Sequence, residues 1–233
     1  MFSVLQNGTL VSKQPLDREQ QANYEFVVKA IDGGKSTVGA GRNSATTTVK
    51  LSLEDINDSV PEITSPLDAY VLENQPVNTV VMPVTVVDRD TGANADIEYF
   101  ITTSDSDAFD IGRLDGILRT RSVLDREARS MYLLTVTVMD MGRPRLSSSA
   151  EIKIHVVDTN DNTPTFQPRQ YSTTLMENAT IGQNILETTA FDADSGPNGD
   201  IRYTIILIFQ TKLFFKNHTK SFLCPIKKTS NIK

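Results

Sequence analysis

The sequence contains a single cysteine, no tryptophan and only two histidines among 233 residues. One cysteine, Cys224, excludes a disulfide within the chain. The chain does not open with the basic, apolar and small-residue succession of a signal peptide. The longest wholly apolar run near its end, Ile205–Phe209, is far too short to span a membrane. Taken literally, these absences predict a cytosolic soluble protein, but the motifs described below predict an extracellular one.

Acidic residues outnumber basic ones by 29 to 23, and the excess lies in the first 200 positions. From Ile201 onward seven residues are basic and none is acidic, so the preceding part holds 16 basic and 29 acidic residues, a net charge of −13. Nucleic acids are bound through basic surfaces, so we expect no nucleic-acid partner. An acidic body leaves cations or basic proteins as partners.

An internal repeat runs through the chain at a nearly constant offset. Leu16-Asp17-Arg18-Glu19 returns 108 positions later as Leu124-Asp125-Arg126-Glu127. Other blocks return in the same order at offsets of 103 to 108: Tyr24–Asp32 as Tyr132–Asp140, Asp55–Pro61 as Asp158–Pro164, Glu73-Asn74 as Glu177-Asn178, and Asp88-Arg89-Asp90 as Asp192-Ala193-Asp194. Such order and spacing indicate tandem units of about 105 residues.

Between these blocks the side chains alternate with the two-residue period of β-strands. The rows, apolar except for Thr47, are Thr47, Val49, Leu51 and Leu53; Tyr132, Leu134, Val136 and Val138; and Ala150, Ile152, Ile154 and Val156. Clusters of Gly, Asn, Asp and Pro separate the rows, and no window has the period of a long amphipathic helix. Units of this size predict an all-β fold of immunoglobulin-like sandwiches.

Three motifs resemble those of cadherin repeats: Leu-Asp-Arg-Glu, Asp-x-Asn-Asp-Asn-x-Pro-x-Phe at Asp158–Phe166, and Asp-x-Asp-Ser-Gly-x-Asn-Gly at Asp192–Gly199. The resemblance extends over residues 1 to about 205 and, with no tryptophan present, favours large protocadherin-like or Fat-like members. It implies tandem Greek-key sandwiches arranged end to end. The expected units are the C-terminal part of a repeat at 1–60, a complete repeat at 61–162, the N-terminal part of a third at 163–205, and an atypical, unstructured tail at 206–233.

The acidic residues are spaced so that the loops at the sandwich ends would bring them together. Around Asp158–Asn162 the pattern gathers seven carboxylates: Glu73, Asp125, Glu127, Asp158, Asp161, Asp192 and Asp194. Like charges so close would repel or hold protons unless cations joined them. Ca²⁺ takes about six to eight oxygen ligands and tolerates irregular geometry, so we predict Ca²⁺ as the cofactor. We expect Arg126 to point away from this cluster.

The resemblance implies three Ca²⁺ ions at each junction between successive repeats and assigns their ligands by position. At the first junction it assigns the carboxylates of Asp17, Glu19, Asp55, Asp58, Asp88, Asp90 and Asp140, the amide of Asn57, and the carbonyls of Ile56, Ser59 and Asn94. At the second it assigns the seven carboxylates named above, the amide of Asn160, and the carbonyls of Thr159, Asn162 and Asn198. Asp32 would serve a junction further upstream. The first junction lacks its leading glutamate and the second its last aspartate.

Alternative roles account for fewer of the acidic residues. A single surface Asp is often a turn former, but turns do not require Asp-x-Asn-Asp-Asn. An EF-hand is excluded because Thr163 and Arg169 stand where that loop needs Gly and Glu. A sugar-nucleotide metal site would need an α/β fold, and His155 and His218 do not make a zinc or base site. The tyrosines and methionines are expected in the core. We find no catalytic constellation and expect neither an enzyme nor a small-molecule substrate.

The predicted function is therefore a calcium-binding segment of a cell-adhesion ectodomain. Ca²⁺ would make the junctions rigid, and the parent protein would meet other cadherin ectodomains, homophilically or heterophilically, on the extracellular side of the plasma membrane. A calcium-stabilised β-sandwich module of a secreted enzyme or matrix protein stays open as an alternative.

Two further features bear on processing. Sequons at Asn7, Asn57, Asn178 and Asn217 predict a glycoprotein, although a glycan on Asn57 would conflict with Ca²⁺ binding. The tail after Ile205 is either a membrane-touching or partner-binding segment or a read-through end, and we favour the second.

Overall fold

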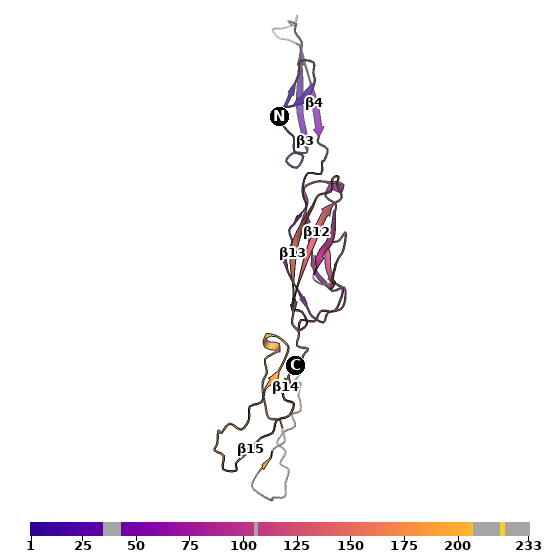
Figure 1. The fold of residues 1–233 in the computed structure, drawn as a ribbon. Coiled ribbons are helices and arrows are strands. Elements are labelled where there is room, and N and C mark those ends of the chain that lie inside the picture. Colours follow the sequence, from indigo (N-terminus) through magenta and orange to yellow (C-terminus); the bar gives the residue numbers. More distant parts are fainter. Residues whose placement is uncertain (35–42, 105–106, 207–219, 222–233) are drawn as a thin grey trace.

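The computed structural model describes residues 1–34, 43–104, 107–206 and 220–221, almost all of them in strands and loops. Three β units follow one another along a line in Figure 1. The helices among the described residues are two short 3-10 turns, η1 (Gly92–Asn94) and η2 (Gly196–Asn198). No described helix has the length and apolar character needed to cross a bilayer. The predicted all-β fold in end-to-end units is confirmed.

The first unit consists of two antiparallel hairpins. Its strands are β1 (Phe2–Val4), β2 (Leu10–Ser12), β3 (Asn23–Ile31) and β4 (Ser44–Ser52). β1 pairs with β2 and β3 pairs with β4. The ring of Phe2 stacks on Phe26 at 5.0 Å and meets Tyr24 edge-on at 5.2 Å, so aromatic contacts join the two hairpins.

The second unit is a sandwich of two sheets. Its strands are β5 (Glu62–Ile63), β6 (Asp68–Leu72), β7 (Val80–Pro83), β8 (Val86–Val87), β9 (Ile97–Ser104), β10 (Phe109–Ile111), β11 (Ile117–Thr120), β12 (Met131–Asp140) and β13 (Ser147–Val157). One sheet has the order β6-β13-β12-β9, the other β10-β11-β7, and β5 pairs with β8. β6 runs parallel to β13, whereas the other pairs are antiparallel.

The core of the second unit follows the alternation predicted from the sequence. Leu134, Val136 and Val138 on β12 are completely buried, as are Ile152 and Ile154 on β13. Burying a side chain of this kind stabilises the fold by about 1.5–3 kcal/mol. The facing sheet contributes further apolar side chains to the same cluster.

The prediction that the tyrosines and methionines lie in the core is wrong for several of them. Tyr132 is buried, but Tyr70 is 66% exposed and Met131 is 48% exposed. The reason is the strand period: Tyr70 and Met131 occupy outward positions of β6 and β12. Tyr70 stacks there on the ring of His155 at 5.0 Å, on the outer face of the sheet.

The described part of the third unit has two short strand pairs. Its strands are β14 (Thr165–Phe166), β15 (Thr174–Leu175), β16 (Ala190–Phe191) and β17 (Lys220–Ser221). β14 pairs with β16 and β15 pairs with β17. The rest of the tail, residues 207–219 and 222–233, lies outside the described residues, as does the sequon at Asn217.

Candidate metal centres

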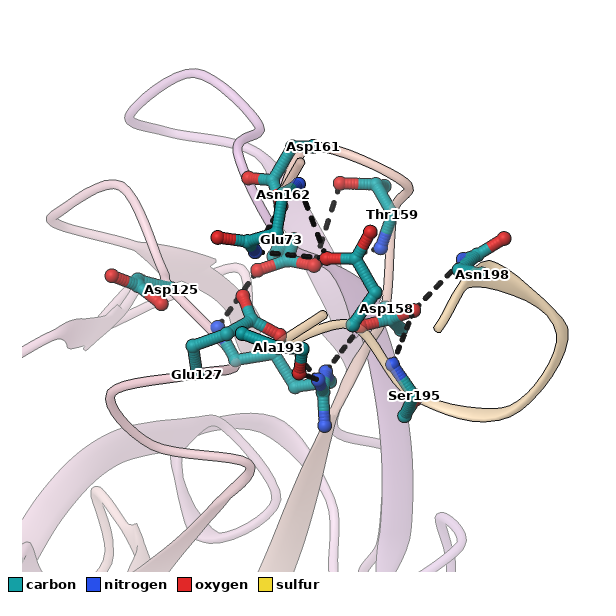
Figure 2. Close-up of polar contacts among 12 residues, drawn as sticks. Glu73, Asp125, Glu127, Asp158, Thr159, Asp161, Asn162, Ala193, Ser195 and Asn198 are labelled. Carbon is teal, nitrogen blue, oxygen red and sulfur yellow. Dashed lines mark hydrogen bonds and ion pairs between the residues drawn. The ribbon is translucent and has the colours of Figure 1, made fainter. Parts of the chain in front are cut away.

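The acidic residues of the second junction come from chain segments that meet where the second unit ends (Figure 2). Glu73 follows β6 directly and Asp158 follows β13 directly. Because these strands run parallel, their C-terminal ends reach the same edge, where the N–H of Glu73 donates to the carbonyl of Val157 at 3.0 Å. The loop before β12 adds Asp125 and Glu127.

Glu73 is the buried centre of this group. Its side chain is 0% exposed. One carboxylate oxygen accepts the main-chain N–H of Arg126 at 2.8 Å and the other accepts that of Thr159 at 2.7 Å. Two main-chain donors hold the carboxylate in one orientation. Oxygens of Glu73, Asp125 and Glu127 lie within 4.8 Å of one another.

A second oxygen set joins the second unit to the third. It consists of Glu127, Asp158 and Asp194, again with oxygens within 4.8 Å of one another. Asp194 belongs to the loop after β16, and its Oδ1 accepts the side-chain amide of Asn162 at 2.8 Å. Glu127 takes part in both sets. The two sets therefore form one continuous group of carboxylates across the junction.

The electrostatic environment differs from one carboxylate to the next. Burial raises the pKa of Glu127, and the negative charge of Glu73 adds to the effect. Burial also acts to raise the pKa of Asp158, but hydrogen bonds from Asn198 and Ser195, together with the guanidinium of Arg126, outweigh it and lower this pKa. The junction thus contains one carboxyl group whose pKa is lowered and one whose pKa is raised.

The first junction repeats the arrangement with residues from the first and second units. Oxygens of Glu19, Asp55 and Asp90 lie within 4.8 Å of one another. Asp140, at the end of β12, is 0% exposed and lies near Asp88. Burial raises the pKa of Asp88, and the charges of Asp90 and Asp140 raise it further. Like charges therefore converge at this junction too.

Several buried oxygens at the two junctions have no hydrogen-bond partner among the described residues. They include Oδ1 of Asn57, Oδ2 of Asp88 and Oδ1 of Asp90 at the first junction, and Oδ2 of Asp194 at the second. A buried carboxylate oxygen without a partner is strongly disfavoured unless a cation balances it. Hard oxygens that converge from loops are the ligands Ca²⁺ prefers, so the residues present fit this ion.

Comparisons with known proteins agree with this arrangement. The cadherin domain family matches residues 67–157. Human protocadherin Fat 4 is 40% identical over 205 residues, which are 88% of this chain and 4% of that protein. The protocadherin-like wing polarity protein stan of Drosophila melanogaster is 37% identical over 86% of this chain and 6% of its own length. The chain is built of cadherin repeats.

Solved structures show the same fold. The protocadherin GammaB4 extracellular domain matches with a TM-score of 0.72 at 29% identity, over 85% of this chain and 33% of that chain. Repeats EC22-24 of mouse cadherin-23 match with a TM-score of 0.61 at 32% identity, over 82% of this chain and 60% of that chain. The cadherin repeats here are thus of the protocadherin and Fat type, and the chain spans only a small part of its curated relatives' length.

The other predicted ligands lie in different surroundings. Asp17, Asp58, Asp161 and Asn160 are exposed at the rims, Asp192 is half-buried, and Ile56 is 73% exposed. Asp32 follows β3, away from the first junction, and accepts the main-chain N–H of Asn43 at 3.1 Å.

Asn94 and Asn198 donate their side-chain amides to Asp55 and Asp158 at 2.9 and 2.8 Å. Their carbonyls, like those of Ile56, Ser59, Thr159 and Asn162, remain predicted ligands.

The prediction that Arg126 points away from the carboxylates is wrong. Its side chain is only 17% exposed and forms ion pairs with Glu127 and Asp158. Burial lowers its pKa, but these two carboxylates outweigh that effect and raise it. Residue 126 lies in a turn, so the alternation of strands does not decide its direction. Its recurrence as Arg18 at an offset of 108 was the available signal.

Asn74 is a second residue that the sequence motifs did not assign to the site. It adopts a φ of +59° directly after Glu73. Its side-chain amide donates to Asp161 and to Thr159. The recurrence of Glu73-Asn74 as Glu177-Asn178 was the signal that could have found it.

Proposed function

We propose that this chain is a Ca²⁺-binding stretch of a cadherin ectodomain in which the ions make the junctions between repeats rigid for cell–cell adhesion. The observation that carries the proposal is the set of buried, unpartnered oxygens at both junctions within the described residues. At the second junction the unpartnered oxygen is Oδ2 of Asp194, whose carboxylate belongs to a group to which two successive repeats contribute. Cations held there would join the repeats.

The chain's own residues would hold the ions at fixed positions. Main-chain donors orient Glu73, and Asn162 orients Asp194. Bound Ca²⁺ would supply the positive charge that these carboxylates share. The proposed holders are Asp17, Glu19, Asp55, Asn57, Asp58, Asp88, Asp90 and Asp140 at the first junction, and Glu73, Asp125, Glu127, Asp158, Asn160, Asp161, Asp192 and Asp194 at the second.

Other cadherin ectodomains are the proposed partners, reached through the parent protein on the extracellular side of the plasma membrane. The relatives named above are large cadherins of this kind. Millimolar Ca²⁺ outside cells suits the weak sites of extracellular modules. Carboxylates from two successive repeats favour a tandem rod over a single accessory module of a secreted enzyme.

Glycans are proposed at two of the three sequons that lie among the described residues. Asn7 and Asn178 are exposed. Asn57 is only 9% exposed, and its amide nitrogen donates to Asp140 and to the carbonyl of Pro144. A glycan would replace one of the two hydrogens on that nitrogen and so remove at least one of these hydrogen bonds at a buried position, so we expect Asn57 to stay unmodified.

Scanning calorimetry of the whole chain in Ca²⁺, in Mg²⁺ and in chelator tests the function. A ligand that binds only the folded state stabilises it by about 2.7 kcal/mol at 100 times its dissociation constant. Ca²⁺ should raise the melting temperature well above the value in chelator. Asp194→Asn should reduce this shift, whereas Asp110→Asn, at an exposed position of β10, should preserve it. Identical melting with and without Ca²⁺ would reject the proposal.

A further inference from the structure

The arginine of each Leu-Asp-Arg-Glu motif bridges two successive repeats. At the second junction Arg126 pairs with Glu127 and Asp158 and donates from Nη2 to the main-chain carbonyl of Ala193 at 2.9 Å. Glu127 and Asp158 belong to the second repeat and its linker. Ala193 belongs to the third. One guanidinium therefore contacts both sides of the junction.

The first junction shows the same arrangement with different neighbours. Arg18 pairs with Glu19 and Asp55 and donates from Nη2 to the main-chain carbonyl of Arg89 at 3.0 Å. Its side chain is 14% exposed, comparable to the 17% of Arg126. Because the acceptor in the next repeat is a main-chain carbonyl, the contact does not depend on whether Arg89 or Ala193 stands there.

The linker aspartate that each arginine contacts is also bound to the following repeat. The Oδ2 atom of Asp158 accepts the N–H of Ser195 at 3.2 Å and the amide of Asn198 at 2.8 Å. The Oδ2 atom of Asp55 likewise accepts the N–H of Thr91 at 3.0 Å and the amide of Asn94 at 2.9 Å. In both cases the Oδ1 atom faces the guanidinium.

We infer that Arg18 and Arg126 are built-in cations of the junctions, which hold successive repeats together where Ca²⁺ is scarce. The inference rests on the proposed function and adds a positioning residue to it. A planar guanidinium suits this task because its fork can reach two carboxylates and a carbonyl at once. Ion pairs that are largely removed from solvent are also screened less by salt than exposed pairs.

Arg18 should therefore matter in the metal-free protein and matter little in the Ca²⁺-bound one. Without Ca²⁺ the arginine is the positive charge that offsets Glu19 and Asp55, so its removal leaves these carboxylates to repel each other. With Ca²⁺ bound, the ions offset the same charges, so the loss of the arginine should matter little. A residue that only supported the local fold would matter in both states.

Single-molecule energy transfer across the first junction separates these possibilities. Dyes are placed on the whole chain at Thr48→Cys and Glu151→Cys, both exposed strand positions, with Cys224→Ser removing the native thiol. Arg18→Ala is compared with Arg18→Lys, which keeps the charge but loses the fork. Arg119→Ala is the matched control. Arg119 lies on β11 and forms an ion pair with Asp115 at the surface, and its loss removes the same positive charge.

In chelator, we expect Arg18→Ala to broaden the distance distribution relative to the parent protein, Arg18→Lys to broaden it less, and Arg119→Ala to leave it unchanged. Saturating Ca²⁺ should bring all four proteins to the same narrow distribution. Two results would overturn the inference: equal widths of Arg18→Ala and the parent in chelator, or a variant that Ca²⁺ cannot narrow while it narrows the parent. If Ca²⁺ narrows no protein, the proposed function fails, and the comparison in chelator still decides the role of Arg18.

Discussion

Asn57 in the linker donates its side-chain amide to the carboxylate of Asp140 at the end of β12, with 3.0 Å between Nδ2 and Oδ2. The same carboxylate accepts main-chain N–H groups of Gly142 and Leu146 at 3.0 and 2.9 Å. Asp140 is 0% exposed. The linker asparagine is thus positioned by an aspartate 83 residues later in the chain, so the first junction depends on the completed second sandwich.

Asn57→Asp should destabilise the metal-free protein, whereas Asn160→Asp should not. The first change replaces a buried donor with a negative charge beside Asp140, and an unsatisfied buried polar group costs about 1–3 kcal/mol. Asn160 stands at the equivalent place in the second linker but is exposed, so it is a matched control. Urea unfolding in chelator measures both changes. Equal effects at the two positions would contradict the role given to Asp140.

Gly142→Ala should damage the first junction through the same contact. A Cβ atom on Gly142 would lie 2.4 Å from Cγ and Nδ2 of Asn57, so Asn57 would have to leave its partners. Overpacking of this kind costs about 1–3 kcal/mol. Gly33→Ala is the control, since its Cβ would meet no atom within 4 Å. Gly142→Ala should lower the melting temperature in thermal unfolding and weaken Ca²⁺ binding in titration. Gly33→Ala should change neither.

Rim and core substitutions in the second repeat should separate metal binding from folding. Asp125→Ala should weaken Ca²⁺ binding and leave the unfolding free energy in chelator nearly unchanged, because Asp125 is exposed. Ile154→Ala should lower that free energy by about 3 kcal/mol, as truncation of a fully buried aliphatic side chain does. Denaturant unfolding and calorimetric titration of both variants provide the comparison. If Asp125→Ala unfolded the repeat as readily as Ile154→Ala, the placement of this loop would be wrong.

The sequence alone predicted what depends on local period and on repeated motifs. The inward row Tyr132 to Val138 follows from alternation along one strand, which is a local property. The direction of Arg126 did not follow, because a turn has no such period and the three partners of its side chain come from different segments. The contrast between buried Asn57 and exposed Asn160 was also invisible, since it depends on the distant Asp140.

Ca²⁺ affinity should fall as the pH is lowered. The fall should begin at a higher pH than it would for carboxyl groups with ordinary pKa values. The pKa values of Asp88 and Glu127 are raised, chiefly by burial and then by neighbouring negative charges, so the metal-free fold holds these protons to higher pH than the unfolded chain. Their contribution to metal-free stability is therefore present below the unfolded pKa and is lost as pH rises through the folded one.

Ca²⁺ requires the charged carboxylates, so wherever Asp88 or Glu127 holds a proton, Ca²⁺ binding must release it. Calorimetric titration between about pH 5 and pH 7, in two buffers of different ionisation enthalpy, counts the protons released. We expect weaker binding and greater release toward pH 5. Asp115→Asn is the control, because the hydrogen bond from Arg119 lowers the pKa of that exposed carboxyl and keeps it charged throughout this range. A constant affinity with no proton release would contradict this prediction: either Asp88 and Glu127 are already charged before Ca²⁺ binds, or they take no part in its binding.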